Sequence, residues 1–599
     1  MRIIDYYNYI ATAVCAFIGA AAVLIYKKGK NADLDKDKKA AEISANAARV
    51  ILLVIMLIAA AVRLIGLGNV PAGLQQDEAS LGYDAFAIAK YGVDRNGFPY
   101  PIYPITWGCG GGSPLMIYIN VLTIKLFGTG VVKLRLLPAI LGIVTVYIFY
   151  LILKEITLSY KKSLFGAAFL AVCPWHIILS RWSLDSNIMP FTLGLSVYLF
   201  ILGIKTGKTY IYCLSAASYA VCMYSYGSAT IVVPVHLLLI SIYCLRKKII
   251  SIKQLVMAVL TFVIVFAPLL VFYAVNYLGL PEIVTDSFSF NKFTASRSGE
   301  VFLRFDSTLP AALYENIRQL LITLTIGDND EMLCHFIPGY ATLFEFTFPI
   351  TFLGIFLGVF LGKKDIPDKT SENIASANNE SAEDTSKIES VTDEDKRLAM
   401  DAVFVTLLIS CVLLAIGIRS DVSRMVMIFL PLIYFLVKGV SFIWDRKNTF
   451  AYAVMSVILF AAVLFVKDYF VGFNERAENI FMPGYGEAAK RAYEIAGDEK
   501  EIYSTYENLS APFVLALYYT DYDPVKFADT VVYKDEADEF RVAESFGNFR
   551  FGLPEDYADY VGKDAVLILS DSELEAIGGA QDCTVENFGR YSVVYGSGE

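Results

Sequence analysis

The sequence predicts a polytopic α-helical membrane protein with about twelve spans and a C-terminal α/β or α+β domain outside the membrane. Three observations predict this fold class. The 599 residues are 56% hydrophobic, their mean hydropathy is +0.53, and only 18% are charged. A soluble globular protein carries about a quarter charged residues and shorter apolar runs. The composition therefore excludes a soluble enzyme, a disordered chain and a coiled coil.

The net charge and the spacing of histidine and cysteine residues argue against two further classes of protein, nucleic-acid-binding proteins and zinc proteins. The net charge is −10 and the pI is about 5.1, which disfavours nucleic acid as a partner because phosphate binding needs a basic face. His176, His236 and His335 are isolated, and the nine cysteines show no CxxC spacing. We therefore predict no zinc cluster.

Twelve apolar runs are long enough to cross a membrane, because a spanning helix needs about 20 residues. The predicted spans are residues 7–26, 50–68, 135–153, 163–179, 185–204, 209–226, 229–245, 254–277, 342–362, 400–418, 424–443 and 449–466.

Every second loop between these spans is basic. The six basic loops carry 24 lysine and arginine residues together, whereas the short loops between them carry about one each at most. The positive-inside rule places basic loops in the cytoplasm, so both termini are predicted to be extracytoplasmic. Residues 114–128 are apolar but too short to span, and we predict that they form an interfacial helix on the outer surface.

The chain divides into three predicted regions. Residues 1–49 form an N-terminal anchor span and a basic loop, because the first apolar run lacks the features of a cleaved signal peptide. Residues 50–467 form the main transmembrane module. Residues 468–599 form an extracytoplasmic domain.

Within the module, we predict outer loops at 69–134 and 278–341. The polar stretch 363–399 has few aromatic residues and is predicted to be a disordered cytoplasmic linker.

The C-terminal region alternates helical and β-like patterns. We predict amphipathic helices over 486–496 and 535–544, with short strands at the runs EIYSTY, VVY, AVLILS and YSVVYG. It contains no glycine-rich phosphate loop, nucleophile elbow or metal-ligand spacing, so we interpret it as a substrate-shaping or stabilising module.

Two adjacent carboxylates, Asp77 and Glu78, follow the second span at the start of a predicted helix over 79–91. Composition alone allows two ordinary interpretations of this pair: the carboxylates complement the helix dipole, or they are simply exposed to solvent.

A series of motifs around this pair resembles the lipid-carrier-dependent glycosyltransferases of the GT-C superfamily, in particular those related to dolichyl-phosphate-mannose protein mannosyltransferases and the aminoarabinose transferase of lipid A. The similar segments occur in the same order over roughly residues 50–440. They are QDEASLGYDAF, GVDRNGFPYPIY, GGSPLMIYINVLTIKLFG with VVKLRLLPAIL, FLAVCPWHIILSRWSLDSN, YSYGSATIVVP and GDNDEMLCHFIPGYATLF.

The resemblance implies an inverting transferase that moves a sugar from a polyprenyl-phosphate donor to an acceptor hydroxyl at the outer face of the plasma membrane. The partners implied are the lipid-linked donor and a protein, lipid or cell-wall glycan acceptor. Asp77 matches the loop aspartate of these enzymes and is the expected general base, because a phosphate leaving group needs no strong acid. Glu78 would orient Asp77 or hold the acceptor. No cofactor is expected, and dependence on a divalent metal stays open.

The resemblance also suggests residues for the lipid phosphate, which needs a cationic cradle at the interface. Arg424 is the first candidate and Arg181 the second, although snorkelling alone explains an arginine at a span end. Further candidates for contacts with sugar, phosphate or carrier are His335, Asp328, His176 and Tyr226. Two departures matter: Gly112-Ser113 replaces the usual lysine, and Thr230 stands near the position of a usual arginine.

Two rival functions come from other classes. A polyprenyl-lipid or polysaccharide transporter would suit twelve spans, but the spans show no internal repeat and the charges lie at span ends. A non-catalytic scaffold whose C-terminal domain binds wall polymer is the third hypothesis. Loss of transfer in Asp77→Asn would favour the enzyme over both.

Overall fold

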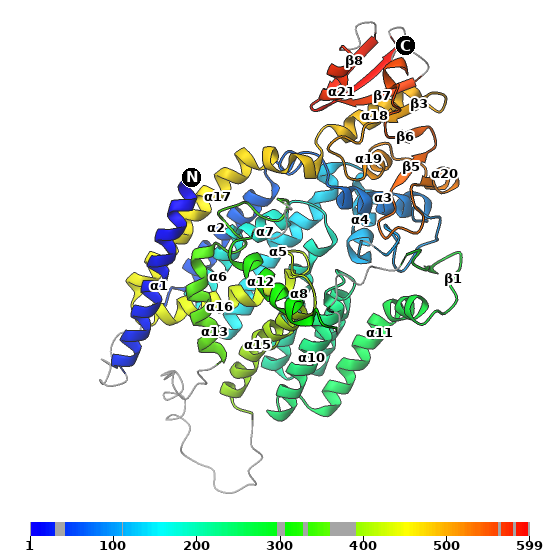
Figure 1. Cartoon of the computed structure of the whole chain (residues 1–599). Coiled ribbons are helices and arrows are strands. Elements are labelled where there is room, and N and C mark those ends of the chain that lie inside the picture. The colour runs from blue at the N-terminus through cyan, green and yellow to red at the C-terminus, as the bar shows by residue number, and fades with distance from the viewer. Residues whose placement is uncertain are drawn as a thin grey trace.

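A computed structural model describes residues 2–29, 42–110, 112–295, 303, 306–327, 333–359, 391–560, 565–578 and 583–596. It consists of a large helical bundle and a smaller domain with a β-sheet at one end of that bundle (Figure 1). A single long helix, α17, leads from the bundle to this domain. The architecture matches the predicted fold class.

Each predicted span coincides with helical structure. The helices of the bundle are α1 (Ile3–Gly29), α2 (Ala45–Leu64), α5 (Val131–Thr157), α6 (Tyr160–Val172), α7 (Pro174–Leu179), α8 (Met189–Thr206), α9 (Thr209–Cys222), α10 (Ala229–Arg246), α11 (Ile252–Tyr277), α13 (Phe348–Val359), α15 (Asp393–Gly417), α16 (Phe429–Trp444) and α17 (Asn448–Phe481).

Nine candidate spans in the described part of the chain are long and apolar enough to cross a membrane; they contain α1, α2, α5, α8, α10, α11, α15, α16 and α17. The other three predicted spans, 163–179, 209–226 and 342–362, correspond to shorter helices, so the number twelve stays a prediction. The break between α6 and α7 falls at Pro174, which lacks the N–H that a continuous helix needs.

Elements in the loops between the spans also bear on the predictions. Helix α3 (Gln76–Tyr91) and helix α4 (Pro114–Phe127) follow the second span, and α4 is the predicted interfacial helix. Helix α12 (Leu309–Thr325) and the short strands β1 (Ile283–Val284) and β2 (Ser289–Phe290) lie in the second predicted outer loop. Most of the predicted linker 363–399 lies outside the described residues, but its end is helical because α15 begins at Asp393, capped by Thr392.

The C-terminal domain contains a seven-stranded sheet with the order β4-β5-β6-β3-β7-β9-β8. The strands are β3 (Glu501–Ser504), β4 (Val532–Tyr533), β5 (Ala543–Phe546), β6 (Phe549–Phe551), β7 (Ala565–Ser570), β8 (Cys583–Phe588) and β9 (Tyr591–Gly596). The central strand β3 is parallel to β6 and β7, and the other pairs are antiparallel.

Helices cover both faces of this sheet. α18 (Tyr485–Ala496) and α19 (Pro512–Tyr519) share a buried core with Val566 and Ile568 of β7. α21 (Asp571–Ala576) packs with Leu567 and Leu569 on the opposite face. α20 (Pro524–Thr530) lies near β5, toward the other edge. The mixed sheet with helices agrees with the predicted α/β or α+β domain.

The helix predicted over 535–544 is wrong. These residues form turns and then enter β5, because the carboxylate of Asp535 accepts a hydrogen bond from the N–H of Ala537 and that of Asp538 accepts one from the N–H of Phe540. Such short-range bonds compete with a helix for the backbone. The predicted boundary at 467/468 falls within α17, which continues to Phe481.

The C-terminal domain and the first outer loop share one hydrophobic core. Buried residues of α3 and α4, such as Tyr83 and Ile117, belong to the same cluster as Ala488 of α18 and Phe513 of α19. The domain therefore packs directly on the helix that carries Asp77, and both lie on one side of the bundle (Figure 1).

Candidate active site

Two buried arginines hold the loop between α2 and α3. Arg181 donates to the carbonyl oxygens of Val62, Gly66 and Val70 at 2.8–3.1 Å. Arg135 on α5 donates to the carbonyls of Pro71 and Gly73 at 2.6 and 2.7 Å. These bonds satisfy carbonyls that follow the end of α2, where a helix leaves its last acceptors unpaired.

Glu78 belongs to this support and not to an open site. Its side chain is 0% exposed and forms a two-bond ion pair with Arg135, with distances of 2.8 and 2.7 Å. It also accepts a 2.8 Å hydrogen bond from the N–H of Ser183. Because these partners occupy both carboxylate oxygens, Glu78 joins α3, α5 and the segment before α8. The structure does not bring it to Asp77 or to an accessible acceptor position.

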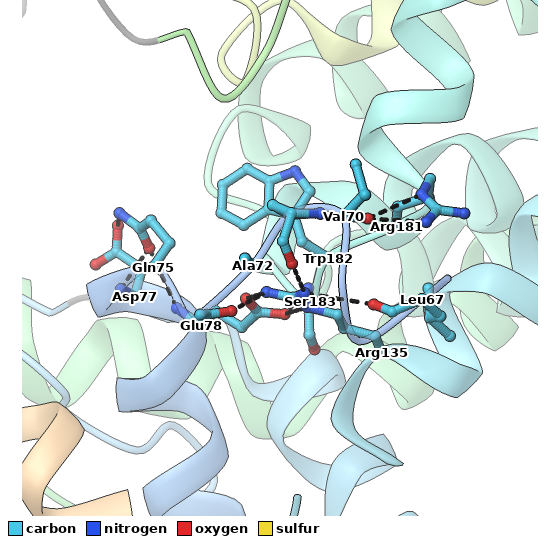
Figure 2. Close-up of polar contacts among 12 residues, drawn as sticks. Leu67, Val70, Ala72, Gln75, Asp77, Glu78, Arg135, Arg181, Trp182 and Ser183 are labelled. Carbon is cyan, nitrogen blue, oxygen red and sulfur yellow. Dashed lines mark hydrogen bonds and ion pairs between the residues drawn. The ribbon is translucent and has the colours of Figure 1, made fainter. Parts of the chain in front are cut away.

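Asp77 lies beside Glu78 but points elsewhere. Successive helical residues are turned by about 100°, and Figure 2 shows Asp77 with Gln75, apart from the Glu78–Arg135 pair. Its Oδ1 accepts from Nε1 of Trp107 at 3.2 Å, and its Oδ2 accepts from Nε2 of Gln75 at 3.3 Å. Gln75 also caps α3 by accepting from the N–H groups of Asp77 and Glu78.

Burial raises the pKa of Asp77, while the hydrogen bonds from Gln75 and Trp107 and the positive charge of His335 lower it. The net direction is upward. A carboxylate with a raised pKa is a stronger base than an exposed aspartate while it stays ionised near neutral pH. The side chain is half-buried, so it keeps access to a reactant.

Polar groups from three other segments gather near Asp77. Asp185, just before α8, interacts electrostatically with it and accepts hydrogen bonds from the N–H and hydroxyl of Ser113, both at 3.0 Å. His335 also interacts with it electrostatically, and Nε2 of His335 lies 3.0 Å from the hydroxyl of Ser423. The segments around 77, 185, 335 and 423 therefore converge.

Arg424 follows Ser423 directly. Its Nε lies 3.0 Å from Oδ2 of Asp421, and its Nη1 donates to the carbonyl of Arg419 at 3.1 Å. Its side chain is 24% exposed, and Nη2 has no hydrogen-bond partner within the described residues. Arg424 thus keeps a donor for an anion, whereas the donors of Arg181 are engaged with backbone carbonyls.

Of the remaining predicted site residues, His176 lies in the bundle interior, Tyr226 lies in the turn between α9 and α10, and Asp328 lies outside the described residues. His176 is buried in α7, with Nδ1 2.7 Å from Nη2 of Arg63. Tyr226 is half-buried in the turn before α10 and packs against the bundle core. Asp328 lies outside the described residues. His176 is therefore part of the packed interior and does not reach the site.

Sequence reasoning missed three contributors: Arg135, Trp107 and Asp185. Arg135 and Asp185 both stand inside motifs that carried the resemblance, VVKLRLLPAIL and SRWSLDSN. A charged residue inside an apolar stretch signals a buried partner, and that signal could have found Arg135. Nothing local in the sequence places Trp107 against Asp77.

The C-terminal domain reaches into the site through two contacts. Trp107 is buried, and its ring packs edge-on against Phe513 of α19 and Phe540, with centroids 6.3 Å apart in both pairs. The hydroxyl of Ser510 donates to Oε1 of Gln76 at 2.5 Å, next to Asp77. Within the described residues, no group of three or more His, Cys, Asp or Glu side chains is placed to hold a metal ion. The absence of a zinc cluster stays a prediction.

Comparisons with known proteins agree with this architecture. Residues 112–272 match the sequence family described as dolichyl-phosphate-mannose-protein mannosyltransferase. The structure is similar to that of ArnT from Cupriavidus metallidurans, solved with bound undecaprenyl phosphate, at a TM-score of 0.50 and 11% identity, over 92% of this chain and 98% of that one.

Two more distant structures are also similar. The oligosaccharyltransferase of Archaeoglobus fulgidus has a TM-score of 0.42 at 11% identity, over 80% of this chain and 64% of that one. The protein O-mannosyltransferase complex Pmt1-Pmt2 of S. cerevisiae gives 0.29 at 16% identity, over 38% and 32%. A sequence search among curated proteins finds no match.

Proposed function

We propose that this chain is a GT-C glycosyltransferase, which transfers a sugar from a polyprenyl-phosphate donor to an acceptor hydroxyl outside the membrane. The family match over residues 112–272 and the similarity of the fold to ArnT support this proposal. Asp77 is the general base. The observation that carries this proposal is the half-buried Asp77 carboxylate, fixed by Gln75 and Trp107 where four outer segments converge.

The reaction needs one proton acceptor. Asp77 takes the proton of the acceptor hydroxyl as its oxygen attacks the anomeric carbon of the donor. The bond between that carbon and the phosphate oxygen breaks, and the phosphate leaves with the electron pair as a stable anion. Attack opposite the leaving group inverts the anomeric configuration.

The donor phosphate would lie near Arg424 and His335. Arg424 offers Nη2, and a guanidinium suits phosphate because its donors match the geometry of two oxygens. His335 stands between this segment and Asp77 through its contact with Ser423. Glu78 and Arg181 act as positioning residues, because they fix the loop that presents Asp77.

The test is transfer of labelled sugar from a panel of polyprenyl-phosphate sugars in purified membranes. Asp77→Asn should lower the rate about 10²- to 10⁴-fold, the usual contribution of a general base, with unchanged expression. Asp529→Asn, an exposed carboxylate on α20, is the matched control and should retain full activity. Undiminished transfer in Asp77→Asn would refute its role, and no transfer from any donor in the wild type would count against the enzyme.

A further inference from the structure

The C-terminal domain contains a polar pocket of about 200 Å³ that the proposed reaction does not use. Its walls are Glu507, Asn508, Ser570, Asp571, Ser572 and Arg590, with Tyr591 beside them. It is smaller than the pockets of roughly 300–1,000 Å³ that hold drug-sized ligands, so it has room for a single small ring.

The pocket lies at the point in the sheet where ligands bind in open α/β folds. Strands β3 and β7 are parallel neighbours. After β3 the chain continues to α19 on one face of the sheet, and after β7 it continues to α21 on the other face. The two connections diverge and leave a crevice outside the carboxyl ends of the strands, which is the usual ligand position at such a switch point.

The chemistry of the walls favours a neutral ligand with many hydroxyl groups. Glu507 accepts hydrogen bonds from the hydroxyls of Ser570 and Ser572 through Oε2, and Oε1 has no partner within the described part of the chain. These bonds lower the pKa of Glu507, so it stays ionised at neutral pH. A free carboxylate oxygen, serine hydroxyls and the Asn508 amide form a set that accepts from and donates to neighbouring sugar hydroxyls.

The same walls disfavour the lipid phosphate. Glu507 and Asp571 bring two negative charges to the rim. Against them stands the single positive charge of Arg590, which is shared with α17: Nη1 donates to Oδ1 of Asn479 at 2.7 Å, and Nε lies 3.4 Å from Oε1 of Glu478. The pocket therefore suits the acceptor better than the donor.

A short piece of chain connects this pocket to Asp77. Asn508 lines the pocket, and Ser510, two residues later, donates to Gln76 at 2.5 Å. Two residues span at most about 7 Å. An extended acceptor held in the pocket by one unit can thus present another hydroxyl at the active site.

We propose that this pocket binds one sugar unit of a glycan acceptor and so selects the acceptor of the transfer reaction. The assignment as acceptor site rests on the proposed function, whereas sugar binding itself does not.

The first experiment measures binding without turnover. Full-length Asp77→Asn protein in nanodiscs is titrated with the methyl glycosides of mannose, glucose, galactose and N-acetylglucosamine, and binding is followed by saturation-transfer NMR. At least one glycoside should bind. Adding Glu507→Gln or Ser572→Ala should weaken that binding on the order of ten-fold, because each removes a charged or hydroxyl partner. Adding Asp529→Asn at the other edge of the domain should leave it unchanged.

Three results would overturn the proposal. They are no binding of any glycoside, equal binding by the wild-type pocket and both variants, or binding that Asp529→Asn weakens as much as Glu507→Gln does. In the transfer assay, Glu507→Gln should raise KM for the acceptor and leave KM for the donor unchanged. Sugar binding without any transfer would refute the proposed function alone, whereas transfer without sugar binding would refute the pocket alone.

Discussion

At the scale of single residues, the two adjacent carboxylates of the first outer loop have different roles. Asp77 is half-buried beside hydrogen-bond donors and a histidine, whereas Glu78 is fully buried against Arg135. The sequence identified the pair, because the motif that contains it is local; its side of the membrane stays a prediction. The sequence could not assign the roles, because the direction of each side chain depends on how α3 packs on α5.

If Asp77 is the proposed general base, Trp107 should set the acid limb of the pH–rate profile. Its hydrogen bond lowers the pKa of Asp77 against the raising effect of burial. Trp107→Phe keeps an aromatic ring against Phe513 but removes the N–H, so the pKa of Asp77 should rise further. Since the ionised form is the base, activity should begin to fall at a higher pH than in the wild type as the pH is lowered.

The control for this profile is Trp444→Phe at the far end of the bundle, since its buried Nε1 has no partner among the described groups. It should leave the acid limb in place. A Trp107→Phe profile that overlays the wild type would contradict the role of this bond.

Glu78 should matter for stability as well as for activity. Glu78→Gln leaves the buried Arg135 without its counter-charge, and breaking such a pair costs about 3–5 kcal/mol. Glu315→Gln removes an exposed partner of Arg318 and should cost less than about 0.5 kcal/mol. Thermal unfolding of the two variants in the same detergent checks the contrast, which equal Tm values would disprove.

At the scale of elements, the loop between α2 and α3 closes against the end of α17. Gly73 has φ +79°, and a Cβ on it would lie 2.1 Å from the carbonyl oxygen of Phe481 and 2.8 Å from Pro483. Gly66, in the same loop, has φ +62° and open space around it. The loop therefore tolerates a side chain at one glycine and not at the other.

Alanine substitutions at Gly66 and Gly73 should differ in their effects on stability and activity. Gly66→Ala should cost only the left-handed backbone strain of about 1–2 kcal/mol and keep most of the activity. Gly73→Ala adds a collision with backbone, so it should push the loop from α17, displace Asp77 and lower kcat much more. Transfer rates measured beside Tm values check this, and equal losses in both variants would refute the close approach.

Several elements were predictable and others were not. The spans followed from hydropathy because a bilayer demands long apolar runs. The short helix α7 begins at Pro174, which lacks the N–H that a continuous helix needs. The turns at 535–544 depend on Asp535 and Asp538, whose carboxylates accept hydrogen bonds from nearby backbone N–H groups. The periodicity of apolar residues shows neither effect. Arg181 illustrates the same limit: its position at a span end was visible, but the carbonyls that surround it come from α2 and the following loop.

At the scale of the whole molecule, the C-terminal domain packs directly against the segments around Asp77. It supports Trp107 through Phe513 and Phe540 and shares a core with α3. A chain that ends after Met482 should therefore lose transfer from every donor and acceptor, and not only its acceptor preference. The truncated protein should still insert in the membrane, since the bundle core is separate.

Transfer assays on membranes with matched amounts of full-length and truncated protein test this expectation. Asp529→Asn, which leaves the domain intact, serves as the comparison. Retained transfer to a simple acceptor would show that the domain only shapes specificity.

Helix α17 gives the membrane itself a way to act on the chemistry. Its 34 residues extend about 51 Å, whereas the hydrocarbon core is only about 30 Å thick, so one rigid rod passes from the lipid to the junction with the C-terminal domain. A span that tilts to match a thinner bilayer tilts its outer end as well. Because Gly73 fits closely against that end, we expect the thickness of the bilayer to change the position of the loop that carries Asp77, and with it the rate of the proposed transfer.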